Sequence, residues 1–192
     1  QNKYILIIIL IIDEEISQHH LGGVEFVVER DKVLRKFKKL EECLQKLKTV
    51  AQISKEEYLA SDILQDSTER NFQLAAQACI DIAHHVIADS GWEVPKTYGQ
   101  AFDILSKHGE LPPDLAQTMI SIAGFRNILV HDYTEVDPDQ VYQYLSRLDD
   151  FASFARHAIT WLDKGKGKGL NWMIEQKKMD RLIIKVSNDP DV

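Results

Sequence analysis

The chain has 192 residues, of which 44% are hydrophobic and 28% are charged, and this composition favours one globular core over two domains. The formal net charge of −7 excludes a protein that binds nucleic acid through a broad basic surface, so any contact with RNA has to be local. The two cysteines have neither zinc-site spacing nor the density of a disulfide scaffold, which predicts a reducing, cytoplasmic location.

An apolar run, Tyr4–Ile12, lies near the start of the chain and is followed directly by acidic residues. The run is too short to cross a bilayer, which takes roughly 20 apolar residues, so no membrane association is predicted. A signal peptide is disfavoured because no small-residue cleavage pattern follows. The alternative is a segment foreign to the native domain, with translation starting at Val27 or Val28. Residues 1–28 are therefore expected to be an N-terminal extension.

Helical periodicity begins after this extension. Apolar residues recur every three to four positions over Glu29–Val50, which predicts an amphipathic helix. Ser54, followed three residues later by Glu57, is a capping box that predicts the next helix start. The long proline-free stretch that follows carries a stripe of small apolar residues and is predicted to be the central helix, with Asp62 and Ser67 as candidates for a fresh start.

A shorter helix is predicted after Pro95. It covers Tyr98–Lys107, and Gly109 ends it as a C-cap glycine does. The next helix, predicted over Asp114 to about His131, is apolar in nearly every direction. Such a helix is usually buried on several sides, here by its own bundle and by a second subunit, so a homodimer is predicted.

The last predicted helix begins at Asp137-Pro138 and keeps an apolar stripe as far as Lys164, where alternating lysines and glycines predict a linker. No strand-like alternation occurs between Glu29 and Lys164. The predicted fold class is therefore all-α, a four-to-five-helix up-and-down bundle. The predicted divisions are the extension 1–28, a helical domain 29–164, and a linker and tail 165–192.

Four polar residues near the end of the apolar helix are unexpected on structural grounds: Arg126, Asn127, His131 and Tyr133. On a regular helix Arg126 and Tyr133 lie within about 20° of each other, and Asn127 and His131 within about 40°, so one polar sector holds all four. Arg126 and His131 are about 140° apart, so both meet one phosphate only if the arginine bends round or the helix ends near His131.

These side chains suit cleavage of RNA without a metal. His131 titrates near neutrality and can take the proton of a ribose 2′-OH or give one to the leaving 5′-oxygen. Arg126 would clamp the phosphate and stabilise the charge that grows on its oxygens. Asn127 can orient His131 or the phosphate, and Tyr133 can add a hydroxyl donor and a stacking face for a base.

A structural interpretation of the same residues is also open, because the spacing of Arg126 and His131 is common by chance. In it, Arg126 pairs with Glu69 or Asp81, and His131 caps its helix C-terminus, where a cation is favoured. The pair Glu69-Arg70, in the middle of a core-forming helix, either supports the polar sector or forms a surface salt bridge.

One further cluster has the one-turn spacing of metal ligands and comprises Asp81, His84 and His85. No fourth candidate ligand occurs at a sequence spacing typical of a metal site, so a metal there is disfavoured. The sequence also has no glycine-rich phosphate loop, no Ser/His/Asp pattern and no CxxC. Neither a metal nor a cofactor is predicted.

The stretch Arg126–Tyr133, preceded by Gly124-Phe125, closely resembles the Arg-x4-His-x-Tyr motif of the HEPN superfamily, in its HepT-like (DUF86) branch. The likeness extends to the stretch Glu69–Ala83 and covers about Glu29–Lys164. It implies a helical bundle that dimerises so that two motifs face each other across a cleft. It also implies that Arg126 and His131 are catalytic and that Asn127 and Tyr133 support them.

The resemblance further implies an endoribonuclease toxin of a type VII toxin–antitoxin module, acting on tRNA or mRNA. The implied partner is a minimal nucleotidyltransferase antitoxin of the MntA type, which silences the toxin by AMPylation of Tyr133. Added negative charge and bulk at that hydroxyl would block the phosphate site. The alternative function is a non-catalytic helical partner that binds and regulates a nucleotidyltransferase.

Overall fold

The computed structural model describes the backbone of residues 24–131 and 136–165, and the side chains of residues 32–130 and 136–161. Every regular element within these ranges is helical, which confirms the predicted all-α class. None of the helices in the described part is long and apolar enough to span a membrane. In chain order the elements are α2 (Val24–Val50), α3 (Lys55–Leu59), α4 (Asp62–Asp89), α5 (Tyr98–Lys107), α6 (Pro113–His131), α7 (Pro138–Tyr144), the 3₁₀ turn η1 (Leu145–Arg147) and α8 (Leu148–Gly165).

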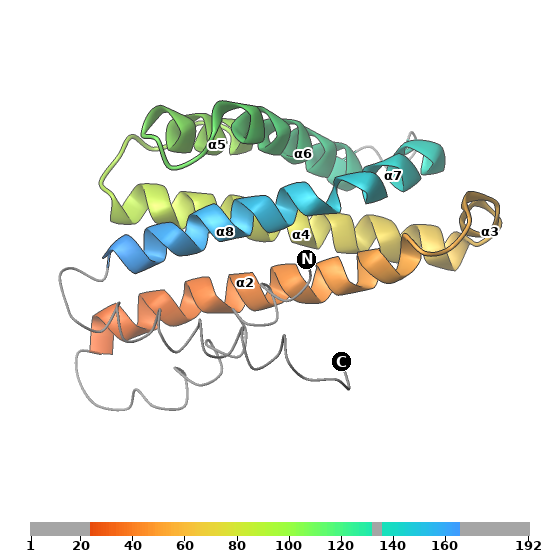
Figure 1. Ribbon diagram of the computed structural model, residues 1–192, viewed down its shortest axis with the longest axis horizontal. Coiled ribbons are helices and arrows are strands. Elements are labelled where there is room, and N and C mark those ends of the chain that lie inside the picture. The colour runs from red at the N-terminus through yellow and green to blue at the C-terminus, as the bar shows by residue number, and fades with distance from the viewer. Residues whose placement is uncertain (1–23, 132–135, 166–192) are drawn as a thin grey trace, which may run out of the picture.

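The four long helices α2, α4, α6 and α8 alternate in direction and form an up-and-down bundle, with α5 beside α6 (Figure 1). Helix α4 contacts each of the other α-helices, so its prediction as the central helix is confirmed. A single apolar core runs through the bundle, and both cysteines are buried in it as free thiols. Its largest fully buried side chains include Tyr58, Phe72, Phe102, Phe151 and Phe154.

Most helix ends lie where the sequence places them. The hydroxyl of Ser54 accepts the backbone N–H of Glu57 at 3.2 Å, which confirms the predicted cap. Ser61 caps the following helix, so the fresh start is at Asp62. Gly109 has a φ of +76°, a conformation that a residue with a side chain rarely adopts, and it follows His108, the C-cap of α5.

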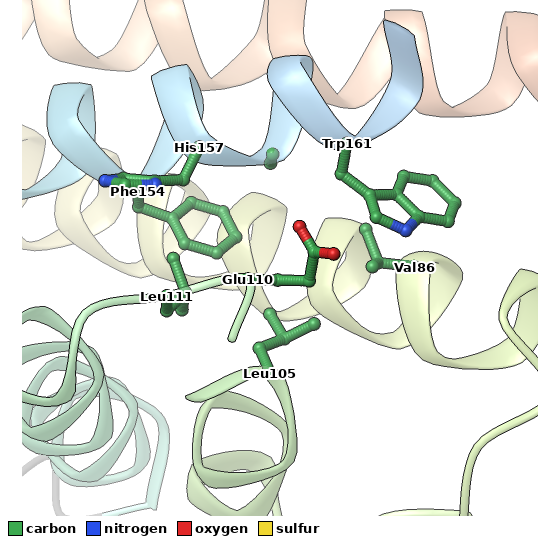
Figure 2. A pocket seen from close by; sticks show the side chains of 8 residues that line it. Val86, Leu105, Glu110, Leu111, Phe154, His157 and Trp161 are labelled. Atoms are coloured by element: carbon green, nitrogen blue, oxygen red, sulfur yellow. The ribbon is translucent and has the colours of Figure 1, made fainter. Parts of the chain in front are cut away.

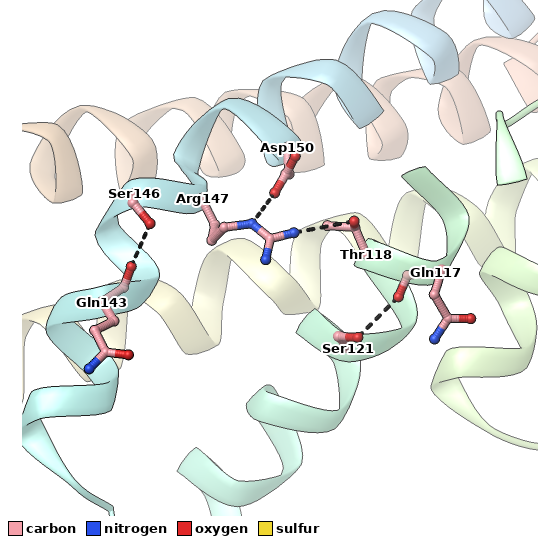
Figure 3. Close-up of polar contacts among 7 residues, drawn as sticks. All are labelled: Gln117, Thr118, Ser121, Gln143, Ser146, Arg147 and Asp150. Atoms are coloured by element: carbon pink, nitrogen blue, oxygen red, sulfur yellow. Dashed lines mark hydrogen bonds and ion pairs between the residues drawn. The ribbon is translucent and has the colours of Figure 1, made fainter. Parts of the chain in front are cut away.

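The prediction of one continuous last helix is wrong, because the 3₁₀ turn η1 separates α7 from α8. A 3₁₀ turn advances about 120° per residue instead of about 100°, so these three residues shift the apolar stripe by roughly 60°. Both helices then bury their apolar residues, Val141 on α7 and Phe151 on α8. At the turn, Arg147 donates to Asp150 at 2.6 Å and to Thr118 of α6 at 3.3 Å, which ties α8 to α6 (Figure 3).

The predicted divisions of the chain stay predictions. Helix α2 begins at Val24, before the predicted boundary at residue 28, and nothing further marks that boundary. The apolar run Tyr4–Ile12 and the tail beyond the lysine–glycine linker lie outside the described residues.

Candidate active site

Helix α6 carries the candidate site and is buried on one side only. Its buried residues pack into the core and include Met119, Ile122, Phe125 and Leu129. Its opposite side is exposed and carries Gln117, Ser121, Gly124, Asn127 and Ile128. Ile128 is the large apolar residue on this side and is 44% exposed. The chain's own bundle therefore leaves one face of α6 open.

Arg126 is half-buried near the end of α6, and its guanidinium carbon lies 5.2 Å from the centre of the Tyr98 ring. Its Nη1 donates to Oδ1 of Asn127 at 3.3 Å, and its buried Nε has no hydrogen-bond partner among the described residues. None of the ion pairs found within the described ranges includes Arg126. The guanidinium charge is thus not neutralised by a carboxylate of this part of the chain.

Neither of the acids suggested as structural partners, Asp81 and Glu69, pairs with Arg126 among the described residues. Asp81 pairs with Lys36 of α2 at 2.6 Å and accepts a hydrogen bond from Gln77 at 2.6 Å. Glu69 is half-buried, and burial, reinforced by the nearby charge of Asp66, raises the pKa of its carboxyl.

The other half of the predicted site lies at and beyond the end of α6. The helix ends at His131, as predicted, but the side chain of His131 is outside the described residues, and so is the whole of Tyr133. Of the four predicted site residues, the structure brings Arg126 and Asn127 together. The placement of His131 and Tyr133 relative to them stays a prediction.

Tyr98, which contacts Arg126, and His84, which contacts Tyr98, were not part of the site predicted from the sequence. Tyr98, at the start of α5, is 37% exposed, and the His84 ring of α4 lies 6.3 Å from its ring. Nε2 of His84 is buried without a hydrogen-bond partner in the described part of the chain. Burial lowers the pKa of His84, and the charge of Asp81 opposes this in part. No sequence spacing links these positions, since they belong to different helices.

The other candidate clusters are dispersed. His84 faces Tyr98 of α5, whereas the ring of His85 meets Trp161 of α8 at 6.3 Å. Neighbouring Asp81 is engaged by Lys36 of α2. Arg70 donates a hydrogen bond to Gln73 at 2.8 Å on the same helix. The contacts of Arg70 therefore give no support to the interpretation that the pair Glu69-Arg70 supports the polar sector around Arg126.

A small pocket lies between α4, the end of α5 and α8, away from the candidate site (Figure 2). Its lining is mainly apolar, and Glu110 and His157 are its polar residues. None of the predicted site residues lines it.

A helical bundle that carries Arg-x4-His-x-Tyr from the end of a core helix defines a protein of the HEPN class. The sequence model described as ribonuclease HepT-like matches residues 40–158. The chain belongs to the HepT-like ribonuclease family.

Named relatives agree with this assignment. The chain is 37% identical over 120 residues to the tRNA nuclease HepT of Aphanizomenon flos-aquae, a match covering 62% of this chain and 82% of that protein. It is 29% identical over 125 residues to the mRNA nuclease HepT of Shewanella oneidensis, covering 65% of this chain and 93% of that protein. The predicted family and the prediction of an endoribonuclease are confirmed.

A solved structure has the same fold. It is the tri-AMPylated HEPN toxin of Shewanella oneidensis in complex with an MNT antitoxin. The TM-score is 0.63 at 27% sequence identity, and the match covers 68% of this chain and 98% of the toxin.

Proposed function

We propose that this chain is the endoribonuclease toxin of a toxin–antitoxin pair and that it cuts RNA without a metal ion, using Arg126 and His131. The observation that carries this proposal is the state of Arg126. It is a cation on a core helix with no carboxylate partner among the described residues, five positions before the histidine at which the helix ends. The relatives named as tRNA and mRNA nucleases support RNA as the substrate.

The proposed reaction is an internal transfer within RNA. A base takes the proton of a ribose 2′-OH, and the 2′-oxygen bonds to the adjacent phosphorus while the bond from phosphorus to the 5′-oxygen breaks. His131 serves as that base or as the acid that protonates the leaving 5′-oxygen. Arg126 donates to the non-bridging oxygens, whose negative charge grows in the transition state. Asn127 supports this step, since its side-chain oxygen already receives Nη1 of Arg126.

Control of the proposed toxin lies at Tyr133. A minimal nucleotidyltransferase antitoxin would transfer AMP from ATP to its hydroxyl and release pyrophosphate, which places an additional phosphate and an adenosine beside the phosphate site of the RNA. Repulsion and steric exclusion would then prevent RNA from binding. Support comes from the S. oneidensis toxin, which is tri-AMPylated and in complex with an MNT antitoxin.

A homodimer is proposed on the open face of α6. Ser121 and Gly124 leave this face with little side-chain bulk, and exposed Ile128 adds apolar surface next to the site. A second copy seated there would bring two motifs to one cleft.

The test is cleavage of RNA by the purified full chain in EDTA, followed on denaturing gels. His131→Ala is expected to abolish cleavage and Arg126→Ala to leave a small residual rate, and both should keep the unfolding temperature close to that of the wild type. Arg156→Ala removes an exposed arginine from α8 and serves as the matched control that keeps activity. Cleavage that needs added metal, or that survives His131→Ala, contradicts the mechanism. A pure chain that cuts no RNA supports the non-catalytic partner instead.

A further inference from the structure

Three helices each contribute one side chain to a continuous contact beside the proposed catalytic arginine. The guanidinium of Arg126 on α6 lies 5.2 Å from the centre of the Tyr98 ring on α5. The His84 ring on α4 lies 6.3 Å from the same ring, tilted by 53°. Tyr98 therefore lies next to both a cation and an imidazole.

The Tyr98 ring is held in place by the start of α5. Thr97 caps this helix, its hydroxyl accepting the N–H of Gln100 at 3.2 Å. Gly99 follows, and a Cβ there would come within 3.2 Å of Ile120 Cγ2 on α6. Glycine thus lets the first turn of α5 lie close against α6. This packing sets the position of the Tyr98 backbone relative to α6, the helix that carries Arg126.

The contact with the Tyr98 ring holds Arg126 but leaves most of its N–H donors free of hydrogen bonds within the described residues. An aromatic face attracts a guanidinium through its quadrupole but does not neutralise the charge or take up the N–H groups in hydrogen bonds. A carboxylate in the same place would do both, and none pairs with Arg126 within the described residues. Within the described residues, its one donor contact is the 3.3 Å hydrogen bond to Asn127.

We propose that Tyr98 is a positioning residue for Arg126, whose ring holds the guanidinium in the orientation in which its donors meet the scissile phosphate. This rests on the proposed function, in which Arg126 binds that phosphate. His84 backs the ring from α4. Since burial lowers its pKa, the imidazole is mainly neutral near pH 7 and adds no second positive charge beside Arg126.

The kinetic test compares two substitutions of Tyr98 in the full chain. Tyr98→Leu removes the ring and is expected to lower kcat about tenfold with little change in KM, since the contact acts through a group that stabilises the transition state. Tyr98→Phe keeps the ring and should restore most of kcat. Trp92→Leu is the matched control. Its ring stacks on His108 at 3.9 Å, at the other end of α5, so it should lower stability without a change in kcat.

A double substitution separates positioning from a direct role. If Tyr98 acts through Arg126, Tyr98→Leu causes no further loss once Arg126→Ala is present. Losses that multiply in the double variant overturn the proposal, as does a Tyr98→Leu variant with the kcat of the wild type.

An NMR measurement keeps this proposal distinct from the proposed function. Nε of Arg126 is buried, so its N–H proton should exchange slowly enough to be observed, and the ring current of Tyr98 should shift its resonance. The shift should vanish in Tyr98→Leu and persist in Tyr98→Phe. A resonance unchanged in Tyr98→Leu overturns the positioning contact whatever the activity. If the shift vanishes in Tyr98→Leu but RNA cleavage does not depend on Arg126, the contact exists and the proposed function is wrong. Tyr98 then has no positioning role in catalysis.

Discussion

Phe125 stacks on Tyr144, with ring centres 4.0 Å apart and planes inclined by 5°. The contact joins α6 to α7, the helices that precede and follow Tyr133 in the sequence. Phe125 also meets Phe72 of α4 edge-on at 5.9 Å. The backbone that carries Arg126 is therefore anchored by aromatic contacts on its buried side.

Phe125→Ala should destabilise the fold strongly. The side chain is 7% exposed, and its removal leaves a cavity beside the rings of Phe72 and Tyr144, which typically costs about 3–5 kcal/mol in the free energy of unfolding. Equilibrium urea unfolding measures the loss. Tyr144→Phe keeps the stacked ring and should change stability by less than about 0.5 kcal/mol. A loss below about 1 kcal/mol in Phe125→Ala would show that the ring cluster does not anchor this helix.

Local patterns in the sequence predict most of this fold. The bounds of α5 and the end of α6 follow from periodicity, a glycine and prolines, all of which act within a few residues along the chain. The contact between Arg126 and Tyr98 depends instead on how closely α5 packs against α6. That distance is set by Gly99 and Ile120, which no spacing connects. The break at η1 was missed because the apolar stripe continues through it in the sequence.

His84 should make stability depend on pH. Its pKa is lowered by burial, so the folded chain binds the proton less readily than the unfolded chain does. Its contribution to stability is full above the ordinary histidine value of about 6.5 and is lost as the pH falls through the folded-state value. Between about pH 7 and about pH 5, the free energy of unfolding should fall less steeply in His84→Gln than in the wild type. Urea unfolding at both pH values measures this, and parallel slopes would contradict it.

Arg126→Lys should retain little activity. Lysine keeps the positive charge but lacks the planar fork that gives two parallel hydrogen bonds to a phosphate. We expect kcat to fall by about 10²-fold, on the scale seen when one donor to a developing oxyanion is removed. Single-turnover cleavage of RNA measures the change. Activity equal to the wild type would mean that Arg126 contributes charge alone, without bidentate geometry.

Gly124→Lys should convert the proposed dimer into a monomer. A Cβ at Gly124 meets no atom within 4 Å in its own chain, and lysine favours a helix more than glycine does, so the monomer should still fold. The same side chain would place bulk and charge in the proposed interface on α6. Ala88→Lys makes a comparable change at an exposed position near the end of α4 and should leave the assembly intact. Sedimentation equilibrium distinguishes the two masses. A dimer that persists in Gly124→Lys would place the interface on another face, and a monomeric wild type would contradict the dimer itself.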